Sequence, residues 1–176
     1  MFQQSPLSKI DRSSVTWILL IINITVFLAW QFMPYEIMVS YFLSIPRVFN
    51  VWTLLANVSH SSVIHILWNM YMLWMLWPII ERYIQQRSYI WLVLVSSLIS
   101  SLAVFLFASG PTLGFSWIVM GLVSFAYFSG RIPLQKDQLW IILVINIVAW
   151  FSSWISFVGH FAGALWWWIY SRYMNR

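Results

Sequence analysis

The chain contains no cysteine among its 176 residues, and only 7% of its residues are charged. The missing thiols exclude disulfide bonds and thiolate metal sites. Soluble domains carry about 25% charged residues, so the scarcity of charge makes water an unfavourable solvent for most of this surface. Hydrophobic residues instead make up 62% of the chain. We therefore expect an integral membrane protein with a single domain, residues 1–176, surrounded by lipid.

Long apolar runs predict an all-α membrane protein with six transmembrane helices, because a spanning helix needs about 20 mostly apolar residues. The predicted spans are Val15–Met33, Val63–Arg82, Ser88–Ser109, Ser116–Ser129, Gln138–Trp154 and Phe157–Tyr170. Gly110 and Pro111 separate the third span from the fourth. The first run lacks an obvious small-residue cleavage site, so we expect a retained helix rather than a signal peptide.

The basic residues predict the orientation of these spans. The nine Lys and Arg residues outnumber four Asp and Glu residues and give a net charge of +5. With six spans, eight of the nine fall on the side of both termini: Lys9, Arg12, Arg82, Arg87, Arg131, Lys136, Arg172 and Arg176. The positive-inside rule places that side, with a short segment at residues 1–14, in the cytoplasm. Basic residues in short gaps between apolar runs indicate membrane topology and argue against a nucleic-acid partner.

The first outer loop, Pro34–Ser62, is long and still apolar. Long loops without secondary structure are usually functional or disordered. An apolar loop of this length is predicted to lie in the membrane interface or against the helix bundle.

The three histidines, His60, His65 and His160, all lie near the outer ends of apolar segments. Polar groups at membrane depth are costly and usually face the interior of the bundle. His65 and Asn69 are four residues apart and share one face of the second predicted helix. Spacing alone favours interhelical hydrogen bonding for them. Haem or metal binding is a minor alternative, because carboxylate ligands are missing, so no cofactor or metal is expected.

Ser116 opens the fourth predicted helix, where a serine is most often an N-cap. His160 lies near the outer start of the sixth predicted helix, which runs in the same direction, so both side chains can lie at the same depth. A histidine beside a serine can take the hydroxyl proton during attack on a carbonyl and return it to the leaving amine. The topology thus permits a nucleophilic serine site at the outer end of the bundle.

The carboxylates are placed away from His160, which favours a Ser–His dyad over a triad. Asp11 and Asp137 belong to the cytoplasmic side, and Glu36 lies in the first outer loop. An oxyanion formed at Ser116 would need preorganised donors. The candidates at the same depth are His65, Asn69 and the backbone N–H of Ser116, which is near a helix start where such groups are free.

Three motifs follow one another in the chain. His60, His65 and Asn69 form a His-x4-His-x3-Asn pattern, Gly114-Phe115-Ser116 begins a Gly-x-Ser-Gly motif, and Gly159-His160-Phe161-Ala162-Gly163 forms the third. Together they resemble the rhomboid family of intramembrane serine proteases over Trp52–Trp167. Glu81 is similar to a glutamate near the inner end of the family's second helix.

The resemblance implies an intramembrane serine endopeptidase with Ser116 as nucleophile and His160 as general base. It implies that His65, Asn69 and the Ser116 amide form the oxyanion hole, and that His60, Gly114 and Gly163 give structural support. The partners are then the lipid bilayer and transmembrane protein substrates, which pass a gate formed by the fifth helix and the adjacent outer loop. The compact six-helix form is typical of a bacterial inner membrane.

The chain departs from the family's pattern at several positions. Trp117 replaces the second glycine of the serine motif, and Trp167 stands where a small residue is common on the sixth helix. Thr53 follows Trp52 where the family often has arginine. The glycine that the family often has shortly before the second-helix glutamate is absent, and Pro78 lies near that place. Trp117 motivates an alternative function, a catalytically silent rhomboid-like protein that binds membrane helices.

Overall fold

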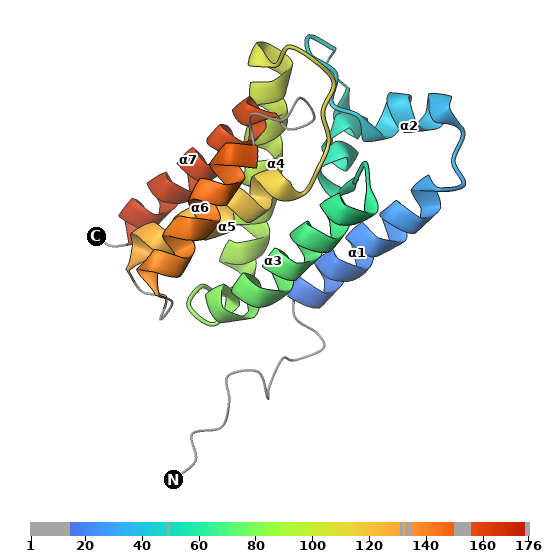
Figure 1. Ribbon diagram of the computed structural model, residues 1–176. Coiled ribbons are helices and arrows are strands. Elements are labelled where there is room, and N and C mark those ends of the chain that lie inside the picture. The colour runs from blue at the N-terminus through green and yellow to red at the C-terminus, as the bar shows by residue number, and fades with distance from the viewer. Residues whose placement is uncertain (1–14, 49, 131, 133–134, 150–155, 175–176) are drawn as a thin grey trace.

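The computed structural model arranges the chain as a bundle of helices (Figure 1) and describes residues 15–48, 50–130, 132, 135–149 and 156–174. The α-helices are α1 (Val15–Trp30), α2 (Tyr35–Phe42), α3 (Val63–Glu81), α4 (Gln86–Phe107), α5 (Ser116–Ser129), α6 (Lys136–Ala149) and α7 (Phe157–Met174). A 3-10 helix, η2 (Val51–Val58), lies between α2 and α3.

Each of the six predicted spans corresponds to an α-helix. The fourth has the predicted bounds, the first ends at Trp30 instead of Met33, and the sixth continues to Met174. The segment 1–14 and the end of the fifth predicted span lie outside the described residues. By length and composition, α3 and α4 are able to cross a membrane, and α1 and α5 are shorter apolar helices.

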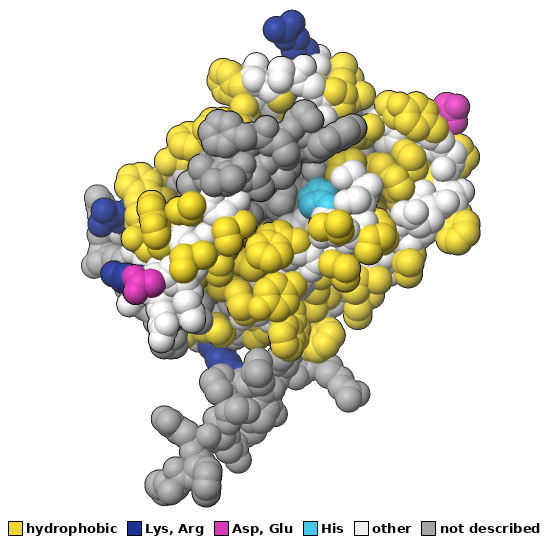
Figure 2. Space-filling view, viewed as in Figure 1, with side chains coloured by type: hydrophobic (Ala, Val, Ile, Leu, Met, Phe, Trp, Pro, Cys, Tyr) yellow, Lys and Arg dark blue, Asp and Glu magenta, His cyan; other side chains and the backbone are white. Residues whose placement is uncertain are grey.

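The face of the bundle seen in Figure 2 is predominantly apolar where its residues are described. Large hydrophobic side chains are exposed on the long helices, among them Ile21 on α1, Ile64 on α3, Trp91 on α4 and Ile141 on α6. Charged side chains on the face shown lie at the margins of this apolar surface (Figure 2). Such a surface suits a lipid solvent and would be unfavourable in water.

Helix α5 lies at the centre of the core. Every residue from Trp117 to Ala126 is buried, because the helix packs against α3, α4, α6 and α7. A helix that is apolar on all sides is expected to be buried in this way. Gly130 ends α5 with a left-handed backbone, φ 64°, which glycine adopts without steric cost.

The first outer loop is folded against the bundle. Helices α2 and η2 pack on each other, and η2 also contacts α4. Ser44 and Thr112 exchange two backbone hydrogen bonds of 2.9 and 3.0 Å, and the Gly114 N–H donates to the Ala56 carbonyl at 2.8 Å. The loop therefore holds the segment that leads into α5.

The end of α3 lies beside the start of α1 (Figure 1), and Glu81, the last residue of α3, joins the two helices. Its carboxylate accepts a hydrogen bond from the Val15 N–H at 3.0 Å and one from the Thr16 hydroxyl at 2.8 Å. A carboxylate at a helix N-terminus satisfies free N–H groups and interacts favourably with the helix dipole.

We expect Glu81→Gln to lower the free energy of unfolding by about 2 kcal/mol, because hydrogen bonds to a charged acceptor are replaced by weaker ones. Thermal unfolding in detergent measures the change. Glu36→Gln is the matched control, since Glu36 is exposed on α2. Equal loss of stability in the two variants would contradict the role given to Glu81.

Candidate active site

Ser116 is the first residue of α5 and is half-buried. The N-cap of the helix is Phe115, which makes no side-chain capping hydrogen bond. The interpretation of Ser116 as an ordinary N-cap is therefore wrong, because the serine lies inside the first turn. Its hydroxyl is not used to cap α5.

Gly114 brings His65 and Ser116 to a common point. A Cβ atom on Gly114 would lie 2.8 Å from His65 Cε1, 3.0 Å from His65 Nε2 and 3.2 Å from Ser116 Oγ. The φ angle of Gly114 is 134°, a conformation that other residues rarely adopt. Glycine is thus required here both by its backbone and by the two side chains that close over it.

The hydrogen bond on the other side of the His65 ring fixes which nitrogen faces this point. Ser61 Oγ lies 3.3 Å from His65 Nδ1, which directs Nε2 toward Gly114. His60 is fully buried and its ring packs edge-on against His65, with centroids 5.0 Å apart. Ser62 accepts a hydrogen bond from the His65 N–H and caps α3. The segment before α3 therefore orients His65.

His160 lies in the first turn of α7 and is 3% exposed. Its Nδ1 is 2.7 Å from the Ser156 carbonyl oxygen. Because a carbonyl only accepts, Nδ1 carries the proton and Nε2 of the neutral ring is an acceptor. This is the tautomer that a general base acting through Nε2 requires.

Asn69 lies one turn below His65 on α3 and is buried. Its Nδ2 donates to the His65 carbonyl at 3.0 Å, within the same helix. The structure thus brings His60, His65, Gly114 and Ser116 together at one end of the bundle. Asn69 lies one turn further along α3, and one of its two amide N–H groups bonds its own helix.

The family assignment follows from the sequence as a whole. A family model, the Rhomboid domain, matches residues 48–176, which is most of the chain. The chain belongs to the rhomboid family. A comparison with curated proteins finds no match. Rhomboids are membrane-embedded and are usually intramembrane serine proteases acting on transmembrane substrates, and the helical bundle agrees with that setting.

The two tryptophans that replace small residues of the rhomboid pattern each pack on a glycine of the facing helix. A Cβ atom on Gly159 would lie 2.8–2.9 Å from the Trp117 indole, and one on Gly121 would overlap the Trp167 indole. Both tryptophans are fully buried. At both places a large residue on one helix faces a glycine on the other, which lets α5 and α7 stay in close contact.

Gly163, assigned to structural support from the motif, faces the backbone of α5. A Cβ atom there would overlap the Trp117 carbonyl oxygen. The small residue at position 163 thus lets α7 approach the backbone of α5 closely. Sequence reasoning missed Gly121 and the partnership of Gly159 with Trp117, because a missing glycine in one helix gives no indication of its substitute in another.

Two serines outside the predicted site also join the helices that carry it. The Ser100 hydroxyl donates to the Gly159 carbonyl at 3.2 Å, and the Ser124 hydroxyl donates to the Ala164 carbonyl at 2.9 Å. Serine hydroxyls commonly link helices in membranes. Their spacing alone could not reveal which neighbouring helix they would meet.

We expect Gly159→Ala to destabilise this rhomboid by about 1–3 kcal/mol, because the added methyl group overpacks the site against the Trp117 indole. The same change should cost less in a Trp117→Ala background, where the ring is absent. Unfolding in detergent of the wild type, the two single variants and the double variant measures this coupling. Gly110→Ala is the control, since its Cβ would meet no atom within 4 Å. Strictly additive effects of the two substitutions on stability would refute the contact between the Trp117 indole and Gly159.

His60 predicts how the stability of this rhomboid depends on pH. Burial, followed by repulsion from His65, lowers the pKa of His60 from 6.5 to about 3. The unfolded chain therefore binds a proton below pH 6.5 that the folded chain does not. The stability contributed by the neutral ring is complete above that pH and is lost as the pH falls toward 3.

Accordingly, the midpoint temperature of thermal unfolding should decrease as the pH is lowered from 7 to 4. The decrease should be smaller in His60→Gln, because glutamine does not titrate. The comparison of the two slopes is the measurement. Equal slopes would show that His60 does not titrate on unfolding as its burial requires.

Proposed function

We propose that this rhomboid is a serine endopeptidase that hydrolyses peptide bonds in or near transmembrane segments of membrane proteins. Its nucleophile is Ser116 and its general base is His160. The observation that carries the proposal is the convergence of His65 Nε2 and Ser116 Oγ at Gly114. An activated serine needs oxyanion donors beside it, and this convergence supplies one.

In the proposed reaction, His160 Nε2 accepts the proton of the Ser116 hydroxyl as Oγ attacks the substrate carbonyl carbon. The proton then passes to the leaving amine, and water attacks the resulting acyl-enzyme with His160 again as base. The Ser156 carbonyl holds the Nδ1 proton of His160 throughout. The sequence offers no carboxylate that would orient His160, so Ser116 and His160 act as a dyad.

The oxyanion is stabilised by the Ser116 N–H and by His65. When the Ser61 hydroxyl donates to His65 Nδ1, Nε2 carries the proton and faces the reacting centre. Asn69 adds a third donor: one N–H of its amide bonds the His65 carbonyl, and the second N–H remains for the oxyanion.

Helix length supports cleavage inside the membrane. The 14 residues of α5 rise about 21 Å, which is less than the hydrocarbon thickness of about 30 Å. With Gly130 at the inner surface, Ser116 lies roughly 9 Å below the outer edge of the hydrocarbon region of an unperturbed bilayer. Short spans of this kind also thin the bilayer locally, which brings water closer to the site.

We propose that a substrate helix enters past α6, and the groove between α3 and α6 marks where α6 is held weakly. This groove, of about 460 Å³, is lined on one side by Trp68, Tyr71 and Met75 of α3 and on the other by Gln138 and Ile142 of α6. Helix α6 packs mainly on α5, so its contact with α3 is slight. Because Gln138 lies beside Lys136 at the end of the bundle remote from Ser116, a substrate helix would reach Ser116 only when α6 and its adjacent outer loop move aside.

We propose six spans formed by α1 and α3–α7, with both termini and residues 1–14 in the cytoplasm of a bacterial cell and residues 1–176 as one domain in its inner membrane. Among the described basic residues, Arg82, Arg87, Lys136 and Arg172 lie at helix ends remote from Ser116, and Arg47 lies in the first outer loop. This asymmetry supports the orientation through the positive-inside rule.

The silent alternative rested on Trp117 beside the nucleophile. Its indole lies over Gly159, in space that a glycine leaves open, so the bulk of the ring is accommodated next to His160. This packing supports the protease over a protein that only binds membrane helices.

Purified protein in proteoliposomes should cut a reporter membrane protein whose transmembrane segment contains glycine or other helix-destabilising residues. Ser116→Ala should reduce cleavage by at least about 10³-fold, because the nucleophile is lost. Ser97→Ala, a half-buried serine on α4, is the matched control and should retain activity. Cleavage products resolved on a gel are the readout, and undiminished cutting by Ser116→Ala would refute the assignment.

A fluorophosphonate probe separates the protease from the silent alternative without any substrate, since labelling requires an activated serine. The wild type should be labelled, and labelling should be lost in both Ser116→Ala and His160→Ala. A folded wild-type protein that stays unlabelled would favour the silent protein.

A further inference from the structure

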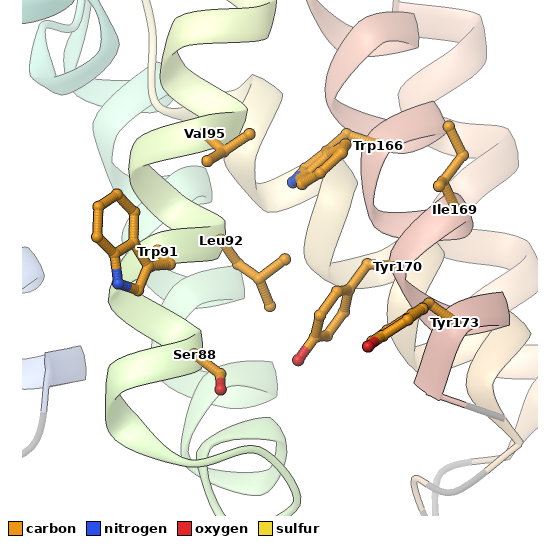
Figure 3. A pocket seen from close by; sticks show the side chains of 8 residues that line it. All are labelled: Ser88, Trp91, Leu92, Val95, Trp166, Ile169, Tyr170 and Tyr173. Atoms are coloured by element: carbon orange, nitrogen blue, oxygen red, sulfur yellow. The ribbon is translucent and has the colours of Figure 1, made fainter. Parts of the chain in front are cut away.

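A second groove lies on the lipid-facing surface between α4 and α7 (Figure 3). Its volume is about 470 Å³, and four residues from each helix line it. Ser88 on α4 and Tyr173 on α7 mark one end of it, near the start of α4 and the end of α7. This end is remote from Ser116 and His160, which begin α5 and α7 at the other side of the bundle. The groove is therefore separate from the proposed active site.

The groove is polar at one end and apolar at the other. The hydroxyl groups of Ser88, Tyr170 and Tyr173 gather at the lower end of the view, and Val95 and Trp166 lie at the upper end (Figure 3). Arg87, next to Ser88 in the chain, is exposed. A ligand that matches this lining has an apolar chain and a head group that accepts hydrogen bonds and carries negative charge.

The length of the groove limits what can occupy it. The lining residues span eight positions on each helix, and the seven steps between the first and the last rise about 10 Å. This is a third of the hydrocarbon thickness of about 30 Å. A transmembrane helix of another protein would need contact through both leaflets, whereas a lipid of one leaflet needs only this depth. Because rhomboids are embedded in membranes, such lipids surround the groove.

We propose that the groove between α4 and α7 binds one phospholipid with an anionic head group, taken from the leaflet that contacts the inner end of the bundle. Its acyl chain lies along Leu92 and Val95. Its phosphate accepts hydrogen bonds from the tyrosine and serine hydroxyls and is attracted by Arg87. Tyrosine side chains are suited to this depth, because their rings are apolar and their hydroxyls are polar.

Native mass spectrometry of the full chain in detergent, with added phosphatidylglycerol, tests the proposal. The wild type should retain one lipid adduct under conditions that strip other lipids. Val95→Trp fills the apolar end and should weaken the adduct about tenfold, the loss expected for roughly two methylenes excluded from the groove. Leu94→Trp is the matched control, since Leu94 is exposed on the same helix and does not line the groove. It should keep the adduct.

Head-group recognition is tested by Arg87→Gln. The wild type should prefer phosphatidylglycerol to phosphatidylcholine, and this preference should shrink in the variant, while total lipid binding in the apolar groove persists. Equal adducts for Val95→Trp and Leu94→Trp overturn the site, and a wild type without preference between the two lipids overturns its selectivity for anionic head groups. Neither result depends on peptide cleavage, so the proposal stands or falls apart from the proposed protease activity.

Discussion

The close contact between α5 and α7 is the constraint on which the rest of this structure depends. Lipid tails are as apolar as leucine, so helices in a membrane associate through tight packing and hydrogen bonds rather than through expulsion of water. Here the packing is made by indoles that lie on glycines and by the Gly163 Cα, which approaches the Trp117 carbonyl. The Ser124 hydroxyl adds a hydrogen bond to the Ala164 carbonyl lower down. Ser116 and His160, each next to a contacting residue, take their relative positions from this interface.

The first outer loop supplies a second constraint, on the segment before α5 and on the His65 ring. Its backbone bonds to Thr112 and Gly114 hold the segment before α5, and its final residues place His60 and Ser61 around the His65 ring. Histidines at membrane depth are costly unless they are enclosed in this manner. The result is a group of polar residues held by the loop at one end of the bundle, with a histidine visible on a face that is otherwise largely apolar (Figure 2).

The sequence predicted much of this arrangement. Apolar runs located the helices to within a few residues, because a spanning segment has a length that lipid dictates. The motifs identified the rhomboid family, which the family model confirms. The sequence did not predict helices α2 and η2, since an apolar loop gives little sign of a short helix. It also placed Asn69 among the oxyanion donors, a role that stays a prediction, with one of its two amide N–H groups bonded to its own helix. The catalytic roles themselves stay predictions.

What the sequence determined by itself is the solvent and the order of the helices. Scarce charge and long apolar runs require lipid, and the basic residues in short gaps indicate the direction of each span. Only the tertiary structure decided how Trp117 and Trp167 fit. Taken along the chain, each is a bulky residue in a place where the family commonly has a small one. In three dimensions each lies on a glycine of the opposite helix, because packing volume is conserved across an interface and not at a single position.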